Sequence, residues 1–231
     1  MPQRWASTRS RSAERRLGRC RAVRLRVVGF YLERVLPWIT DVALSGKEFD
    51  RLRAKVCAGL SGEVLEVGFG SGRNVPHLPP DVARLRAVDP ATAGRRLAAK
   101  RLAATSVPVE FVGLDGEALP LEDASVDHVL TTWTLCTIPD VDRALGEVRR
   151  VLRPGGALHF VEHGLSPDAT VARWQKRLNP VQNLVFGGCH LNRPIDTLLE
   201  RAGLVVSPLE TFYARGPKPF AYLFEGVATK I

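Results

Sequence analysis

The sequence has few cysteines and no long apolar run. Its four cysteines stand at positions 20, 57, 136 and 189, without a Cys-x-x-Cys pair or a local cluster of Cys and His. This spacing indicates neither a disulfide framework nor a zinc site, so no metal is expected. A reducing compartment fits such a composition, and we expect a cytoplasmic protein. Charged side chains break every apolar window of the first helical pattern, so a membrane span is not expected there.

Charge is unevenly distributed along the chain. The formal net charge is +9, but residues 1–26 hold nine Arg and one Glu, which leaves the remainder almost neutral. Residues 1–21 have the composition of a segment that cannot offset the entropy of ordering, and we expect a disordered basic tail. Such a tail could make weak peripheral contact with an anionic membrane. The neutral body argues against specific nucleic-acid binding, which depends on clustered Lys or Arg.

The most informative stretch is a strand pattern that runs into glycines. Residues 64–67, Val-Leu-Glu-Val, precede Gly68, Gly70 and Gly72, and a helical pattern follows. Such glycines allow positive φ and let a ligand approach the main chain, and the following helix offers free N–H groups. A dinucleotide fingerprint would need glycine at Arg73. The pattern Glu-x-Gly-x-Gly-x-Gly instead resembles the first motif of class I S-adenosylmethionine (SAM) methyltransferases.

Two acids after later strand patterns strengthen this resemblance. Asp89 ends a strand pattern about twenty residues past the glycines, where a nucleotide ribose presents its hydroxyls. Segment 114–120, Leu-Asp-Gly-Glu-Ala-Leu-Pro, is similar to a family segment, which implies that Asp115 accepts from the adenine amino group. SAM is therefore the predicted cofactor. Its predicted contacts are Glu66, Gly68, Phe69, Gly70, Gly72, Asn74, Asp89, Pro90, Asp115, Gly116, Glu117, Thr132 and Trp133.

Strand and helix patterns alternate through the middle of the chain. Strands are predicted near 63–67, 85–89, 108–112, 126–132, 157–162 and 220–229, and helices near 91–103, 140–152, 171–178 and 195–202. This order predicts an α/β fold with a doubly wound, mostly parallel sheet and an antiparallel strand at its edge. The resemblance implies a Rossmann-like class I methyltransferase sheet of seven strands. Ligands of such sheets lie at the carboxyl ends of the strands.

The N-terminal part of the body has its own pattern. Residues 27–44 have helical apolar spacing interrupted at Pro37, and a second helix is expected near 47–57. We expect residues 22–58 to form a helical lid over the cofactor or to pack on the sheet, within one methyltransferase domain that spans residues 22–231.

A more specific resemblance covers roughly residues 47–230. Segments 134–138 (Thr-Leu-Cys-Thr-Ile), 162–163 (Glu-His) and 188–193 (Gly-Cys-His-Leu-Asn-Arg) resemble the mammalian methyltransferase-like proteins that S-methylate alkyl thiols, and their bacterial relatives. This resemblance implies a small-molecule acceptor, most specifically a thiol. The chain departs from that family at Phe69, where cysteine is commoner, and in its Arg-rich N-terminus, where the mammalian proteins carry a hydrophobic anchor.

Two histidines are candidates for catalysis. His163 follows the fifth strand pattern, at the end of the sheet where a general base could take an acceptor proton, although a loop histidine can serve only as a hydrogen-bond partner. His190 could face the acceptor or be structural. Cys136 and Cys189 are expected to be small buried residues, because methyl transfer needs no covalent intermediate. Asn192 is expected to cap the next helix.

The acceptor itself stays open at this level. A SAM-dependent methyltransferase acting on a thiol is the leading hypothesis, with O-, N- or C-methylation of a lipid, quinone precursor or other small metabolite as alternatives. No Asn/Asp-Pro-Pro-Tyr/Phe motif follows the fourth strand, where 131–134 reads Thr-Thr-Trp-Thr, so methylation of nucleic-acid bases loses support. A hypothesis of another class is a membrane-associated or nucleic-acid-binding protein targeted by its basic tail.

Overall fold

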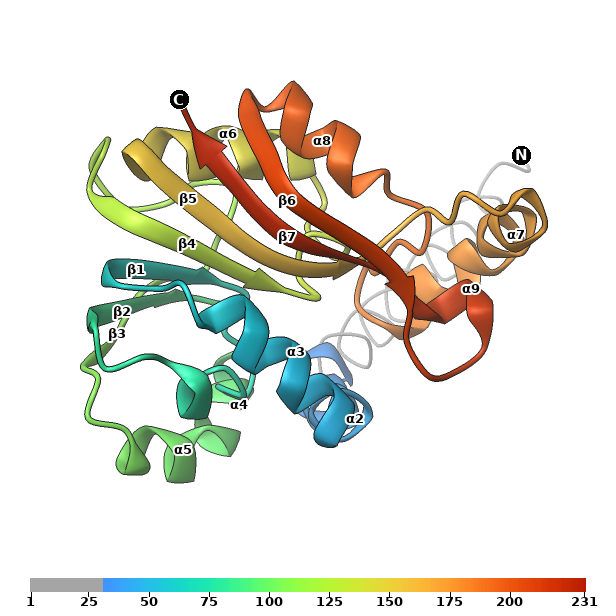
Figure 1. Ribbon diagram of the computed structural model, residues 1–231. Helices are drawn as coiled ribbons and strands as arrows, with labels where there is room; N and C mark the ends of the chain where they lie inside the picture. Colours follow the sequence, from blue (N-terminus) through green and yellow to red (C-terminus); the bar gives the residue numbers. More distant parts are fainter. Residues whose placement is uncertain (1–30) are drawn as a thin grey trace, which may run out of the picture.

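The computed structural model describes residues 31–231 and is built on one mixed sheet with helices on both faces (Figure 1). The predicted basic tail and residues 22–30 of the predicted lid lie outside the described residues. The strand order is β3-β2-β1-β4-β5-β7-β6. The strands are β1 (Gly62–Val67), β2 (Val82–Val88), β3 (Val109–Gly113), β4 (Val126–Thr132), β5 (Leu152–His163), β6 (Leu204–Tyr213) and β7 (Tyr222–Lys230). The predicted fold class is confirmed.

The central strand β1 makes parallel pairs on both sides. Glu66 lies opposite Ala87 of β2 on one side and opposite Leu130 of β4 on the other. The order of the strands reverses there, and the carboxyl ends of β1 and β4 therefore flank the expected ligand crevice. Strand β7 is antiparallel to both β5 and β6. It was predicted at the edge, but it lies second from the edge, and β6 covers its outer side.

The helices are η1 (Tyr31–Val35, a π-helix), α2 (Leu36–Ala43), α3 (Lys47–Cys57), η2 (Val75–His77, a 3-10 helix), α4 (Thr92–Leu97), α5 (Ala99–Ala104), α6 (Val141–Val151), α7 (Ala169–Val185), α8 (Ile195–Arg201) and α9 (Lys218–Ala221). Helices α6 and α8 cover one face of the sheet, and α3 covers the opposite face (Figure 1). Within residues 31–231 no helix combines the length and the apolar character needed to cross a bilayer.

Helix α6 shows how sequence pattern becomes packing. Asp140 caps it by accepting a hydrogen bond from the Arg143 backbone N–H, which is one of the donors that a helix start leaves unpaired. Its apolar residues recur at helical spacing and all are buried against the sheet: Val141, Ala144, Leu145, Val148 and Val151.

Several predicted boundaries differ from the structure. The helix predicted over 91–103 is two short helices, α4 and α5. Strand β5 begins at Leu152, because a bulge absorbs residues 153–156: Val126 pairs with Leu152, and His128 pairs with Ala157. Helix α7 continues past the predicted end at 178 and contains Pro180. The proline removes one helical hydrogen bond, but the pattern resumes, and the Phe186 N–H donates to the Gln182 carbonyl.

Candidate functional site

The glycine turn after β1 takes a backbone path that other residues would resist. Gly68, Gly70 and Gly72 have φ of 82°, 56° and 71°. A Cβ on Gly68 would lie 2.0 Å from Thr134 Oγ1, and a Cβ on Gly94 would lie 2.2 Å from the Gly70 carbonyl oxygen. Gly70 itself faces open space and lines a cavity of about 70 Å³. The turn thus presents bare backbone to this cavity.

Asp89, directly after β2, fixes that turn. Its Oδ2 accepts a hydrogen bond from the Gly70 N–H at 2.7 Å, and its Oδ1 accepts from the Ala91 N–H at 2.6 Å. The residue is 6% exposed, and burial raises the pKa of its carboxyl despite these two hydrogen bonds. The structure thus gives this predicted ribose ligand a second role, which is to hold the glycine loop.

Glu66 and Asn74 meet below the turn and leave two buried oxygens unpaired. Asn74 Nδ2 donates to Glu66 Oε1 at 2.8 Å and to Thr132 Oγ1 at 3.0 Å. Glu66 Oε2 and Asn74 Oδ1 have no partner within the described residues. Burial raises the pKa of Glu66 to about 8. Asn74 lines the cavity and Glu66 lies next to it, so these two unpaired acceptors fit a ligand that brings positively charged N–H donors, as the amino group of SAM does.

Arg53 of α3 joins this cavity and was missed from the sequence. Its side chain is 3% exposed, its Nη1 donates to the Leu44 carbonyl at 2.9 Å, and its guanidinium lies 4.8 Å from the centroid of the Trp133 ring. Burial lowers its pKa to about 10, so it remains charged at neutral pH. The available signal was a cation on the apolar stripe of a helix, between Phe49 and Val56 at helical spacing.

Helix α2 is tied to the glycine turn by one carboxylate. Asp41 accepts from Arg73 Nε at 2.8 Å, from Arg73 Nη2 at 3.0 Å and from Ser71 Oγ at 2.5 Å, and Arg101 Nη2 lies 3.5 Å away. Burial alone would raise the pKa of Asp41, but these hydrogen bonds and charges leave it lowered. Because no residue of α2 is fully buried, this polar network is what fastens the helix to the turn.

The remaining predicted cofactor residues have mixed positions. Asp115 is exposed, and its Oδ1 accepts from the Glu117 N–H at 2.8 Å. Glu117 Oε1 accepts from the Asp140 N–H, so this side chain braces the start of α6. Gly116 is half-buried beside Val67, whereas Pro90 is exposed. Phe69 is buried and packs edge-on against Phe111.

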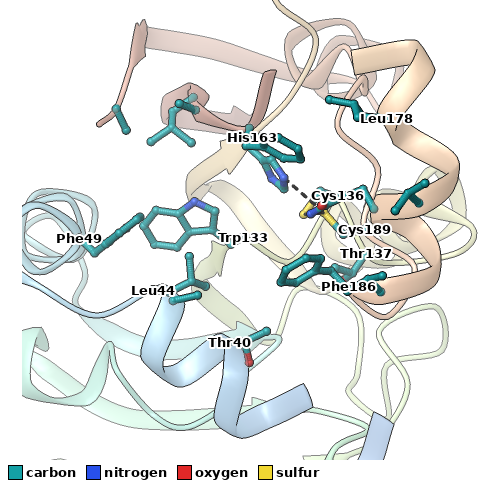
Figure 2. A pocket seen from close by; sticks show the side chains of 18 of the residues that line it. Thr40, Leu44, Phe49, Trp133, Cys136, Thr137, His163, Leu178, Phe186 and Cys189 are labelled. Atoms are coloured by element: carbon teal, nitrogen blue, oxygen red, sulfur yellow. Dashed lines mark hydrogen bonds between the residues drawn. The ribbon is translucent and has the colours of Figure 1, made fainter. Parts of the chain in front are cut away.

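A second and larger cavity adjoins the first. It has a volume of about 560 Å³, lies beyond the ends of β4 and β5, and is walled by α2, the start of α3 and α7 (Figure 2). Thr40 of α2 and Leu44, directly after α2, line both cavities. Trp133, which has the unusual φ of 51° for a non-glycine residue, forms the wall on the β4 side and packs against Phe49. The lining is mostly apolar or aromatic, and its polar members beside His163 are Thr40, Thr137, Gln182 and Arg215.

Three reactive side chains meet on one wall of the larger cavity. Cys189 Sγ lies 3.3 Å from His163 Nε2 and 3.7 Å from Cys136 Sγ, and Figure 2 shows them pointing together. Contacts with Cys136 and His163 lower the pKa of the Cys189 thiol against the effect of burial. Burial would lower the pKa of His163, but Cys189 and Glu162 leave it raised. Buried cysteines were predicted, but their meeting with His163 was not.

Neighbouring groups hold this cluster in place. Arg193 Nη1 donates to the Leu135 carbonyl, and its Nη2 donates to the Ile138 carbonyl at 2.6 Å. Glu162 Oε1 accepts from the Thr134 N–H at 2.9 Å, and burial raises the Glu162 pKa to about 7. These contacts fix both ends of the loop that carries Cys136.

Two further residues with predicted roles, His190 and Asn192, lie between α7 and α8. His190 is outside the lining of the cavity; its backbone N–H donates to the Cys136 carbonyl at 2.8 Å, and its Nδ1 lies 3.2 Å from the same oxygen. These contacts tie the segment of His190 to the loop that carries Cys136. The predicted cap by Asn192 is wrong, because α8 begins after Pro194 and has no side-chain cap.

Comparison with known proteins identifies relatives of this arrangement. Residues 65–160 match a family described as a methyltransferase domain. Thiol S-methyltransferase TMT1A of Homo sapiens is 40% identical over 63% of this chain and 62% of its own length. Thiol S-methyltransferase TMT1B of Rattus norvegicus is 36% identical over 71% of this chain and 68% of its own length. A solved SAM-dependent methyltransferase from Aquifex aeolicus shares the fold, with a TM-score of 0.60, 20% identity, and coverage of 84% of this chain and 98% of its own.

Proposed function

Because the chain belongs to the SAM-dependent methyltransferase family that includes the thiol S-methyltransferases, we propose that it transfers a methyl group to the sulfur of a small apolar thiol. The thiol S-methyltransferases TMT1A and TMT1B extend beyond the region that this chain matches.

The smaller cavity and the strand ends beside it offer groups that suit SAM. The free oxygens of Glu66 and Asn74 would receive its amino group, and Arg53 would face its carboxylate. Asp89 has remaining acceptor capacity for the ribose hydroxyls, and Asp115 is the proposed adenine partner. When bound, SAM supplies a methyl group on a positively charged sulfur, which makes the methyl carbon electrophilic.

The single observation that carries the acceptor class is the larger cavity. Its walls offer an acceptor mostly apolar and aromatic surface, and it meets the cofactor cavity at Thr40 and Leu44. An apolar acceptor would gain free energy by burial there, whereas a cationic one would lose its hydration and meet the like charge of Arg215. Exclusion of water by the same surface favours in-line transfer to a positioned nucleophile.

A thiol fits the polar groups that this cavity does contain. A cysteine-like thiol has a pKa of about 8.5, so a modest fraction is already the nucleophilic thiolate at neutral pH. The role of general base predicted for His163 would require that its Nε2 first release Cys189, which lies 3.3 Å away. A thiolate is also intrinsically very nucleophilic, which favours sulfur over a phenol oxygen of similar acidity.

A series of acceptors tests this proposal. The full-length protein is incubated with SAM and with alkanethiols of increasing chain length. The methylated product is quantified by mass spectrometry, and kcat/KM is obtained for each thiol. Each added methylene should raise kcat/KM by about fourfold until the cavity is full, since burial of one methylene contributes about 0.8 kcal/mol. Thiols of equal length that end in an ammonium group are the matched control and should react poorly, because the charged side chain on the wall is Arg215. Alcohols or amines that react while all thiols fail would contradict the proposed acceptor.

A further inference from the structure

The geometry of the cluster at the cavity wall matches that of a metal site. In a tetrahedral zinc site with Zn–S of about 2.3 Å and Zn–N of about 2.0–2.1 Å, two sulfurs lie about 3.8 Å apart and a sulfur and a nitrogen lie about 3.6 Å apart. The observed separations are 3.7 Å between the sulfurs of Cys136 and Cys189, and 3.3 Å between Cys189 Sγ and His163 Nε2. All three atoms lie within 4.8 Å of one another.

From these distances, the structure assigns Cys136, His163 and Cys189 as a zinc site with one open coordination position. Two thiolates and one imidazole form a donor set that favours zinc over the hard cations magnesium and calcium, which take oxygen ligands. Zinc sites closed by four protein ligands are structural, whereas three protein ligands leave one position for water or substrate. Among the described residues, no fourth Cys, His, Asp or Glu joins the group.

The ligands come from three separate segments that the fold holds together. Cys136 follows β4, His163 ends β5, and Cys189 follows α7, so no short sequence motif links them. The loop of Cys136 is fixed by Arg193 at two carbonyl oxygens, and the segment of Cys189 is tied to it through the His190 N–H and the Cys136 carbonyl. Little rearrangement is therefore needed to bring the three donor atoms around one ion.

The open position faces the acceptor cavity, because all three ligands line that cavity. This assignment rests on the proposed function: the open position binds the sulfur of the acceptor. On binding, the acceptor S–H bond breaks, a zinc–sulfur bond forms, and the proton passes to solvent. Zinc coordination favours deprotonation of a bound thiol at neutral pH. In this account His163 holds the metal and is a positioning residue, so the acceptor proton does not pass to its Nε2.

The site itself is tested on the full-length protein. After metal removal and incubation with zinc, about one tightly held zinc per chain is expected, and Cys136→Ser, Cys189→Ser and His163→Ala should each lose most of it. Cys57→Ser is the matched control, since Cys57 is also a buried free cysteine but lies in the core cluster that includes Val56 and Leu60, and it should keep its zinc. A folded wild-type protein that retains no zinc, or a Cys136–Cys189 disulfide in its peptide map, would overturn the assignment.

Cobalt provides a readout that does not depend on the variants folding. Cobalt(II) loaded into the wild-type site should give thiolate-to-cobalt charge-transfer bands and the strong visible bands of tetrahedral coordination; octahedral, sulfur-free spectra would refute the site. Addition of an alkanethiol without SAM should then shift the visible bands. If cobalt binds with these spectra and the thiol causes no shift, the open-position assignment fails while the metal site stands. Failure of thiol methylation in the presence of a bound metal would count against the proposed function alone.

Discussion

Asp41→Asn should weaken cofactor binding by loosening the contact between α2 and the glycine turn. The substitution keeps the shape of the side chain but removes the charge that Arg73 and Arg101 face. Asp41 and Arg73 are 17% and 18% exposed at the side chain, so the pair is neither fully buried nor a surface pair. Exposed ion pairs contribute about 0–1 kcal/mol and hydrogen bonds to charged groups about 1.5–3 kcal/mol. We therefore expect the Asp41 network to stabilise the docked position of α2 by about 2 kcal/mol.

That free energy sets the size of the expected effect. A loss of about 2 kcal/mol corresponds to a factor of up to about 30 in the equilibrium between docked and undocked α2. SAM affinity, measured by titration calorimetry, should fall by about 10- to 30-fold, while the melting temperature should change little because α2 contributes no fully buried residue. Asp142→Asn is the control, since it removes an exposed pair with Arg201 that is remote from the glycine turn. Equal SAM affinity in wild type and Asp41→Asn would refute the lid role.

Three other substitutions test the buried charges. Because the pKa of Glu66 is raised to about 8, SAM binding should require release of its proton, and SAM affinity should increase as pH rises toward 8. Glu66→Gln should bind SAM with an affinity that does not change with pH. The same pH dependence of SAM affinity in wild type and Glu66→Gln would count against Glu66 as a ligand. Arg53→Met should weaken SAM binding by about 10-fold or more at unchanged melting temperature, and unaltered calorimetry would remove Arg53 from the site. Burial lowers the pKa of His159 from 6.5 to about 4, so between pH 6.5 and 4 its imidazole is protonated in the unfolded chain but neutral in the folded protein. The free energy of unfolding should therefore fall by up to about 3 kcal/mol as pH drops through that window. In His159→Gln the free energy of unfolding, measured by chemical denaturation, should fall less steeply with decreasing pH. An identical pH dependence in wild type and His159→Gln would contradict this role of His159.

The part of the fold that could be predicted from the sequence is local. The glycine turn after β1 and the acid after β2 depend on backbone conformation and on adjacent residues, so Gly68 and Asp89 are placed as the pattern predicts. Strand β6 has a largely exposed pattern that includes Pro208, and nothing in its own residues required a strand; its pairing with β7 supplies the order.

The acceptor side depends on tertiary contacts that no local pattern contains. Cys136, His163 and Cys189 are separated by 26 or more residues, and they meet only because β4 and β5 pair side by side and the chain returns to them after α7. Sequence spacing therefore indicated no metal, although the folded chain gathers two sulfurs and an imidazole. Arg53 could not be predicted for a related reason: the sequence places a cation on the apolar side of a helix, but only the folded structure shows the cavity that this cation lines.

The proposed thiol acceptor can be tested within a single molecule. The full-length protein is incubated with SAM carrying a trideuterated methyl group and with an apolar mercaptoalkanol, which offers a thiol and a hydroxyl at the two ends of one chain. Mass spectrometry with fragmentation then locates the label. The account predicts the trideuteromethyl group on sulfur, in amounts equal to the S-adenosylhomocysteine formed. Label on oxygen, or consumption of an added amine or phenol while the mercaptoalkanol stays unmodified, would contradict it.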